Sequence, residues 1–363
     1  MKLLKKQILP GRYPAPAFLV TLTCPDGFSV MLSSAGAAVR AVLCPQSDGS
    51  LKNIALSFAD DAAYAGNGLY AGAVLAPAAG RISNGVLPVG GRMIHLTRNE
   101  NGVHTLHGGA QNASFRNWTI TETGCSEAEA SVTFSLTLPD GLDGFPGTRH
   151  LTASYRLTSS RALSLSLTAI SDKETYIDLS SHAYFNLSGD FGRDALSHEL
   201  LIRSRSVAVN RPDFIPDRIV PVESTPFDFT SERSLKEQMA AYPGDPQLKG
   251  NCGWNHCFVL EREAGEDPMD KPALTCSHPG SSVRLRAYTD APCMVLYSGG
   301  YIERGLPLMA GLQAENSTGP ECAGGCIDAG DGISVSPAPV IARSVPSCGL
   351  AFEFQGYADA PGG

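Results

Sequence analysis

Apolar and polar residues alternate along much of the chain, and this alternation predicts the strands of a sheet. The clearest examples are residues 131–138, 151–157, 162–170, 283–287 and 350–354. In the first of these, every second residue is valine, phenylalanine or leucine, and the residues between them are serine or threonine. Because successive side chains of a strand point to opposite faces, this pattern is typical of antiparallel strands with one buried face.

Helical periodicity is rare. The best candidate is the segment 231–241, in which Thr230 or Ser231 would cap the N-terminus and Leu235 and Met239 would share a face. No internal repeat, glycine-rich phosphate loop or low-complexity linker interrupts the chain, and turns with proline and glycine are spread evenly. The pattern therefore predicts an all-β fold, a large antiparallel β-sandwich with few short helices, formed as a single domain over residues 1–363.

Charge and hydropathy exclude several classes of protein. The 28 Lys and Arg against 36 Asp and Glu give a net charge of −8, and no basic run is present, so we expect no nucleic-acid partner and no anionic membrane surface. No stretch reaches the roughly 18 apolar residues that a membrane helix needs.

Prolines interrupt the N-terminal segment, which argues against a signal peptide. We expect a cytoplasmic protein.

The ten cysteines are scattered and form no C-x-x-C motif. Cys252 and Cys257 flank His256, a combination that would suit a metal site. Buried free thiols in a reducing compartment are the interpretation that the pattern favours. We therefore expect neither a metal nor a disulfide framework.

Three segments carry candidate chemistry. His107 precedes two glycines, which permit positive φ and a close backbone approach to a ligand. His182 lies in a stretch that also holds Tyr184, and Glu315 ends an apolar stretch that would raise its pKa toward the range of a general base. Each also has a plain structural interpretation, a hydrogen-bonded histidine or a solvated glutamate. Spacing alone does not bring these residues together.

The order of several motifs resembles the aldose 1-epimerase (galactose mutarotase) family. The segment 101–109 resembles the N-x-L-H-G-G element of that family. The segment 181–189 is similar to its N-H-S-Y-F-N-L-x-G element. The other matching segments are 80–85, 143–147, 225–229, 253–260, 297–300 and 311–315. One such match is weak, but eight in the same order are specific to the family.

The resemblance implies a twisted β-sandwich (a galactose mutarotase-like supersandwich) with an open sugar site, and cofactor-free interconversion of the α and β anomers of an aldose. By position, Glu315 falls on the general base of the family and His182 on its general acid. Arg81 and His107 fall on substrate-binding positions, as does Asn255, and we expect Tyr184 to contact the substrate as well. The partner would be a monosaccharide, and the protein a monomer or homodimer.

That chemistry needs only a base and an acid. The base removes the proton of the C1 hydroxyl while the acid protonates the ring oxygen, the C1–O5 bond breaks, and the ring closes again on the other carbonyl face. A carboxylate and an imidazole suffice, and each such group typically contributes 10²–10⁴-fold. An arginine can hold hydroxyl groups without competing for the proton.

Three positions depart from the family pattern. Asn255 stands where the family has aspartate, Gly80 where it commonly has asparagine, and Val295 where it has glutamine. Because the acid–base pair is kept while sugar contacts change, we expect the reaction type to be retained and the preferred sugar to differ from galactose or glucose.

Other functions stay open at this point. A non-catalytic sugar-binding or sensor module on the same fold would bind sugar without accelerating anomer exchange. An enzyme for a modified sugar, such as a sugar phosphate, would need a cluster of basic side chains, and only Arg81, Arg92 and Arg116 are candidates. A retaining glycosidase would need two placed carboxylates, and a purely structural role would leave His182 and Glu315 without an explanation.

Overall fold

The computed structural model describes residues 1–8, 16–313, 327–328 and 339–356, and almost all of its regular structure is strand. The largest sheet has eight strands, antiparallel except where β26 joins β1 in parallel. In spatial order these strands are β26 (Ile327–Asp328), β1 (Lys2–Ile8), β2 (Ala17–Thr23), β3 (Ser29–Ser33), β4 (Ala38–Pro45), β5 (Leu51–Asn53), β25 (Pro307–Leu312) and β27 (Pro339–Arg343).

A four-stranded sheet packs on this sheet and holds three of the five predicted alternating segments. Its strands are β11 (Thr119–Cys125), β12 (Glu129–Leu138), β13 (Arg149–Thr158) and β14 (Leu163–Ser171), which confirms three of the predicted strands. The inward residues Phe134 and Tyr155 are buried in the core between the two sheets, and the Tyr155 hydroxyl donates to the carbonyl of Ala37 at 2.7 Å.

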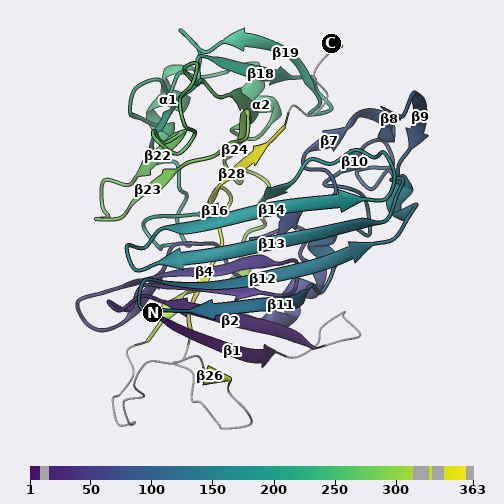
Figure 1. Ribbon diagram of the computed structural model, residues 1–363. Coiled ribbons are helices and arrows are strands. Elements are labelled where there is room, and N and C mark those ends of the chain that lie inside the picture. Colours follow the sequence, from purple (N-terminus) through teal and green to yellow (C-terminus); the bar gives the residue numbers. More distant parts are fainter. Residues whose placement is uncertain (9–15, 314–326, 329–338, 357–363) are drawn as a thin grey trace.

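A six-stranded sheet occupies the upper half of the molecule in Figure 1 and provides one wall of the site. Its order is β16 (Tyr184–Phe185), β28 (Leu350–Gln355), β24 (Cys293–Tyr297), β21 (Asn255–Val259), β18 (Ser206–Asn210) and β19 (Pro216–Pro221). Beside it lies a four-stranded sheet of β20 (Arg233–Ser234), β17 (Glu199–Ile202), β22 (Leu274–Ser277) and β23 (Arg284–Ala287).

Three two-stranded ribbons complete the sheets. They are β7 (Arg81–Ile82) with β10 (Thr105–Leu106), β6 (Val74–Leu75) with β15 (Ser180–Ser181), and β8 (Val86–Val89) with β9 (Arg92–His95). The all-β prediction is therefore confirmed.

The two α-helices are short: α1 (Leu235–Ala241) and α2 (Pro246–Gly250). The predicted start of the first helix was wrong, because Arg233 and Ser234 pair with β17 as strand β20 and only Leu235 begins the helix. No helix in the described part of the chain has the length and apolar character needed to cross a lipid bilayer.

Candidate active site

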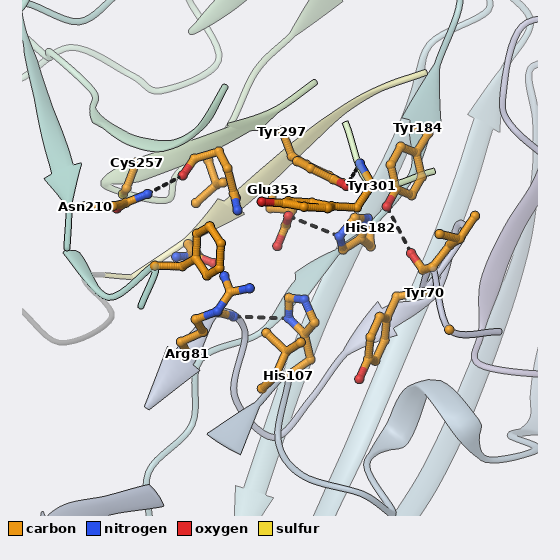
Figure 2. Close-up of a pocket in the computed structure, with 18 of the residues that line it drawn as sticks. Tyr70, Arg81, His107, His182, Tyr184, Asn210, Cys257, Tyr297, Tyr301 and Glu353 are labelled. Atoms are coloured by element: carbon orange, nitrogen blue, oxygen red, sulfur yellow. Dashed lines mark hydrogen bonds and ion pairs between the residues drawn. The ribbon is translucent and has the colours of Figure 1, made fainter. Parts of the chain in front are cut away.

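A cavity of about 570 Å³ opens between the six-stranded sheet and the loops around β7 and β10 (Figure 2). Small-molecule sites commonly measure about 300–1,000 Å³, so the cavity suits a small ligand. Eight of the positions singled out in the sequence line it: Gly80, Arg81, His107, His182, Tyr184, Asn255, Cys257 and Val295. Glu315 lies outside the described residues.

The strand register builds the floor of this cavity. Cys257 of β21 pairs with Val295 of β24, and Val295 pairs with Glu353 of β28. These three side chains face the cavity because they share one rung of the sheet, and alternate residues of each strand point the other way. On that other face, Phe258 and Leu296 are fully buried in the core.

His182 meets a carboxylate at the centre of the cavity. The backbone N–H of His182 donates to the carbonyl of Ala73 at 2.9 Å, and its carbonyl accepts from Gly72 at 3.0 Å, so this connection between β15 and β16 is fixed. The imidazole Nε2 lies 3.2 Å from Oε1 of Glu353, and both side chains are about 5 % exposed. Figure 2 shows the Glu353 carboxylate between His182 and the side of the cavity that holds Arg81.

Only one imidazole nitrogen of His182 is available to a ligand. Its Nδ1 is sealed from solvent and has no hydrogen-bond partner among the described residues. The ring packs against those of Tyr184 and Tyr297, with centroids 4.7 Å and 6.2 Å away. A ligand in the cavity therefore reaches His182 through Nε2.

His107 is held as a neutral donor. The backbone N–H of Gly80 donates to Nδ1 of His107 at 3.2 Å, so the proton of the neutral ring resides on Nε2. Burial lowers the pKa of His107 well below its ordinary value, and the neighbouring His182 and Arg81 lower it further. His107 is thus a fixed Nε2–H donor that stays uncharged near neutral pH.

Arg81 is oriented by a partly buried ion pair. Its Nε donates to both oxygens of Glu100 at 2.9 Å and 2.8 Å, and its Nη2 donates to Oε1 at 2.6 Å. The guanidinium also lies over the ring of Phe214, 5.1 Å from its centroid. The Nη1 nitrogen has no partner in the described part of the chain, so Arg81 can offer it to a ligand.

Tyrosine rings form the apolar part of the wall. Burial raises the pKa of Tyr70 and of Tyr297 to about 12, and it raises the pKa of Tyr184 well above its ordinary value, so all three stay neutral phenols. The Tyr184 hydroxyl donates to the carbonyl of Leu69 at 3.1 Å. Tyr184 therefore presents a ring face rather than a spare hydroxyl to the His182 side of the cavity.

The three departures from the family pattern all lie on this cavity, since Gly80, Val295 and Asn255 line it. The Asn255 carbonyl accepts from the side chain of Asn210 at 2.7 Å, while its own side-chain amide has no hydrogen bond within the described residues. Asn255 thus offers a neutral amide to a ligand, and Val295 offers only apolar surface.

His107, His182 and Glu353 bring three potential metal ligands within 4.8 Å of one another. The tautomer of His107 argues against a metal here, because Nδ1 is occupied by the Gly80 N–H and Nε2 carries the proton. His256, the metal-ligand candidate near Cys252 and Cys257, points to the core. Its Nε2 lies 3.1 Å from Oε1 of Gln247. None of the eight cysteines among the described residues is in a disulfide.

Glu353 was not among the candidates from the sequence. It lies in the predicted strand 350–354, where leucine and phenylalanine mark the core face. An acidic residue among apolar ones in a strand that returns to the core was the available signal. What it faces depends on strands β24 and β16, which the local pattern does not specify.

The fold and the cavity together define a class: a β-sandwich with a cavity of small-molecule size that is lined by a histidine and a buried carboxylate. The family model described as "Aldose 1-epimerase" matches residues 19–362. The chain belongs to the aldose 1-epimerase family, and it is an isomerase that interconverts the α and β anomers of an aldose.

Individual relatives agree with this assignment. An aldose 1-epimerase of Escherichia coli (strain K12) is 30% identical over 288 residues, which cover 79% of this chain and 80% of the relative. A galactose mutarotase of Rattus norvegicus is 28% identical over 77% of this chain and 76% of its own length. The crystal structure of a galactose 1-epimerase from Lactobacillus acidophilus NCFM superposes with a TM-score of 0.74 at 25% identity and covers 97% of this chain and 90% of that one.

Proposed function

We propose that the cavity around His182 is where the anomers are interconverted, with His182 as the general acid and Glu315 as the general base. The observation that supports this most is the placement of Nε2 of His182, which is the accessible ring nitrogen and faces a cavity of about 570 Å³. His182 would protonate the ring oxygen and Glu315 would accept the C1 hydroxyl proton. The role of Glu315 rests on its position in the family motif.

The remaining polar groups would hold the sugar hydroxyls. His107 supplies an uncharged Nε2–H donor, Arg81 supplies Nη1, and Asn255 supplies an amide that can both donate and accept. The ring face of Tyr184 would form the wall of the sugar site on the side of His182. A phosphorylated sugar is not favoured, because the two arginines that line the cavity, Arg81 and Arg218, already pair with Glu100 and Asp217.

The test is polarimetry on His182→Asn and Glu315→Gln. Because an acid or a base group typically contributes 10²–10⁴-fold, each variant is expected to lose at least about 100-fold in kcat with an unchanged melting temperature. His95→Asn and Glu122→Gln, at exposed positions, are the matched controls. A near-wild-type rate in either site variant contradicts the role given to that residue.

The preferred sugar would differ from galactose or glucose. Asn255, Gly80 and Val295 replace residues with other hydrogen-bonding capacity, and all three line the cavity. Anomer-exchange NMR over a panel of aldoses measures the preference directly. A clear preference for galactose contradicts this part of the proposal, and saturable binding without faster exchange contradicts the enzymatic role of the cavity.

We propose that the protein acts in the cytoplasm, without nucleic acid, metal or cofactor, as a monomer or homodimer. The lack of a disulfide among the eight described cysteines supports a reducing compartment. Both arginines that line the cavity, Arg81 and Arg218, are paired with carboxylates, which suits an uncharged monosaccharide that needs no cofactor for this reaction.

A further inference from the structure

We propose that Glu353 and His182 act together as one acid, in which a single proton is shared between the carboxylate and the imidazole and is delivered to the ring oxygen. This inference deepens the proposed function and rests on it. It assigns to Glu353, which no motif marks, a role beside the reacting atoms.

The geometry of the pair is the first argument. Nε2 of His182 and Oε1 of Glu353 are 3.2 Å apart, which is within reach of a hydrogen bond, and the two side chains are 6% and 5% exposed. Apart from ring contacts, each of these two side chains has only the other as a partner within the described residues. A carboxylate buried in this way needs a proton or a cationic partner, because burial of a lone charge is costly.

The second argument is access. Because Nδ1 of His182 is sealed, a sugar can meet this imidazole only at Nε2, which is where Glu353 now lies. The ring oxygen that receives the proton must therefore come to rest against the Glu353 carboxylate as well. Glu353 lines the same cavity as His182, and Figure 2 shows both side chains facing its interior.

The third argument is the charge of the surroundings. Burial raises the pKa of Glu353, while His182 and Arg81 oppose this rise. His107 does not compete for the proton, because its Nδ1 is held by Gly80 and its pKa is lowered well below the ordinary value. Other titratable or charged side chains face the pair from the elements that pack against it. They are Tyr70, Arg81, His107, Asp178, Tyr184, Cys257 and Tyr297.

The proton balance then follows. The pair begins with one shared proton, and the imidazole keeps its other proton on Nδ1 throughout. The shared proton passes from Nε2 to O5 as the C1–O5 bond breaks, and the proton of the C1 hydroxyl passes to Glu315. This leaves the open-chain aldehyde and a pair without its proton. After the carbonyl turns, the O5 hydroxyl returns its proton to the pair, Glu315 returns its proton to O1, and the ring closes.

The experiment is the pH dependence of kcat and of kcat/KM for Glu353→Gln. Glutamine is close in shape to glutamate but carries no charge, so the shared proton loses its anionic partner. We expect the loss of activity at high pH to begin at least about one pH unit lower than in the wild type, kcat near pH 8 to fall 10-fold or more, and KM to change less than threefold. Glu353→Asp should restore part of the rate and of the wild-type profile.

Two results would overturn the inference: a Glu353→Gln enzyme with a wild-type pH profile, or one whose KM alone has changed. Glu122→Gln is the control for the loss of a carboxylate. Should Glu353→Gln fail to fold, the ¹H–¹⁵N spectrum of the wild-type His182 ring decides, because a proton absent from Nε2 at neutral pH contradicts the shared acid. Glu315→Gln separates the two proposals: if it keeps the wild-type rate, the base was misassigned, whereas the high-pH shift in Glu353→Gln still reports on the pair.

Discussion

At the scale of single residues, backbone amides decide what the histidines of this protein can do. Gly80 N–H occupies Nδ1 of His107, Asn255 N–H occupies Nδ1 of His256 at 3.0 Å, and Leu187 N–H occupies Nε2 of His198 at 2.9 Å. Each ring is thereby fixed in one neutral tautomer. His182 is different, since its Nε2 meets a carboxylate, and this difference supports its proposed role as the proton donor.

Asn255→Asp is the residue-scale test of sugar recognition. A hydrogen bond to a charged group is worth about 1.5–3 kcal/mol and a neutral one about 1 kcal/mol, so the family's aspartate should bind a sugar hydroxyl more strongly. We expect kcat/KM for galactose to rise about tenfold. Competition kinetics over the aldose panel measure it, with Asn101→Asp at an exposed position as the control. An unchanged ratio between the aldoses would remove Asn255 from the specificity-determining residues.

At the scale of elements, a tight turn after β10 presents His107 to the cavity. His107, Gly108 and Gly109 have φ of 48°, 85° and 103°. Behind the turn, the carboxylate of Asp143 accepts the N–H groups of Ala110 and Gln111 at 3.0 Å and 2.8 Å. The two glycines are needed because a side chain on Gly109 would meet Asp143 at 2.5 Å. The histidine is thus positioned by backbone geometry, and its ring also packs against that of Tyr70, with centroids 4.6 Å apart.

Gly108→Ala tests this turn. A Cβ at residue 108 would lie 2.6 Å from Cδ of Pro77, in addition to the strain of φ +85°. Gly141→Ala is the matched control, since Gly141 has φ +75° and nothing within 4 Å of the added Cβ. We expect Gly108→Ala to lower the free energy of unfolding by about 1–3 kcal/mol more than the control and to reduce kcat/KM. Equal effects in urea denaturation would mean that the contact with Pro77 relaxes freely.

At the scale of the whole molecule, the cavity draws on residues from Phe58 to Gln355. Walls contributed by segments this far apart in the chain require that the sheets fold together. We therefore propose that residues 1–363 form a single domain, and the expected observation is one cooperative transition in urea.

The pH dependence of stability also belongs to this scale. Burial lowers the pKa of His256 to about 3 and that of His198 to about 4. These rings resist protonation in the folded state but accept it when unfolded, so the stability they contribute is present above pH 6.5 and is lost as the pH falls toward 3. Asp178 acts in the opposite direction, because burial raises its pKa to about 6.

His256→Gln isolates one of these contributions. Between pH 6.5 and 5 a single histidine that stays neutral contributes a loss of about 2 kcal/mol, at 1.36 kcal/mol per pH unit. We expect the variant to lose less stability than the wild type over this range by about that amount, as measured by urea denaturation. His95→Gln, at an exposed position, should behave as the wild type. Parallel losses in His256→Gln and the wild type would contradict a neutral buried His256.

The sequence by itself determined the strands and the family. Alternation reports a local backbone geometry, so residues 131–138 could be identified without knowing their partners, and the motifs around His107 and His182 could be recognised in order. The start of the first helix was missed because the pairing of Arg233 and Ser234 with β17 overrides a local capping signal.

Only the tertiary structure decided how these side chains meet. The contact between His182 and Glu353 depends on β16 and β24 flanking β28 in one register, and a shift by one residue would turn Glu353 into the core. The tautomer of His107 likewise depends on the N–H of Gly80, which directly precedes β7, the strand that pairs with β10. Such pairings join segments far apart in the chain, and no local pattern encodes them.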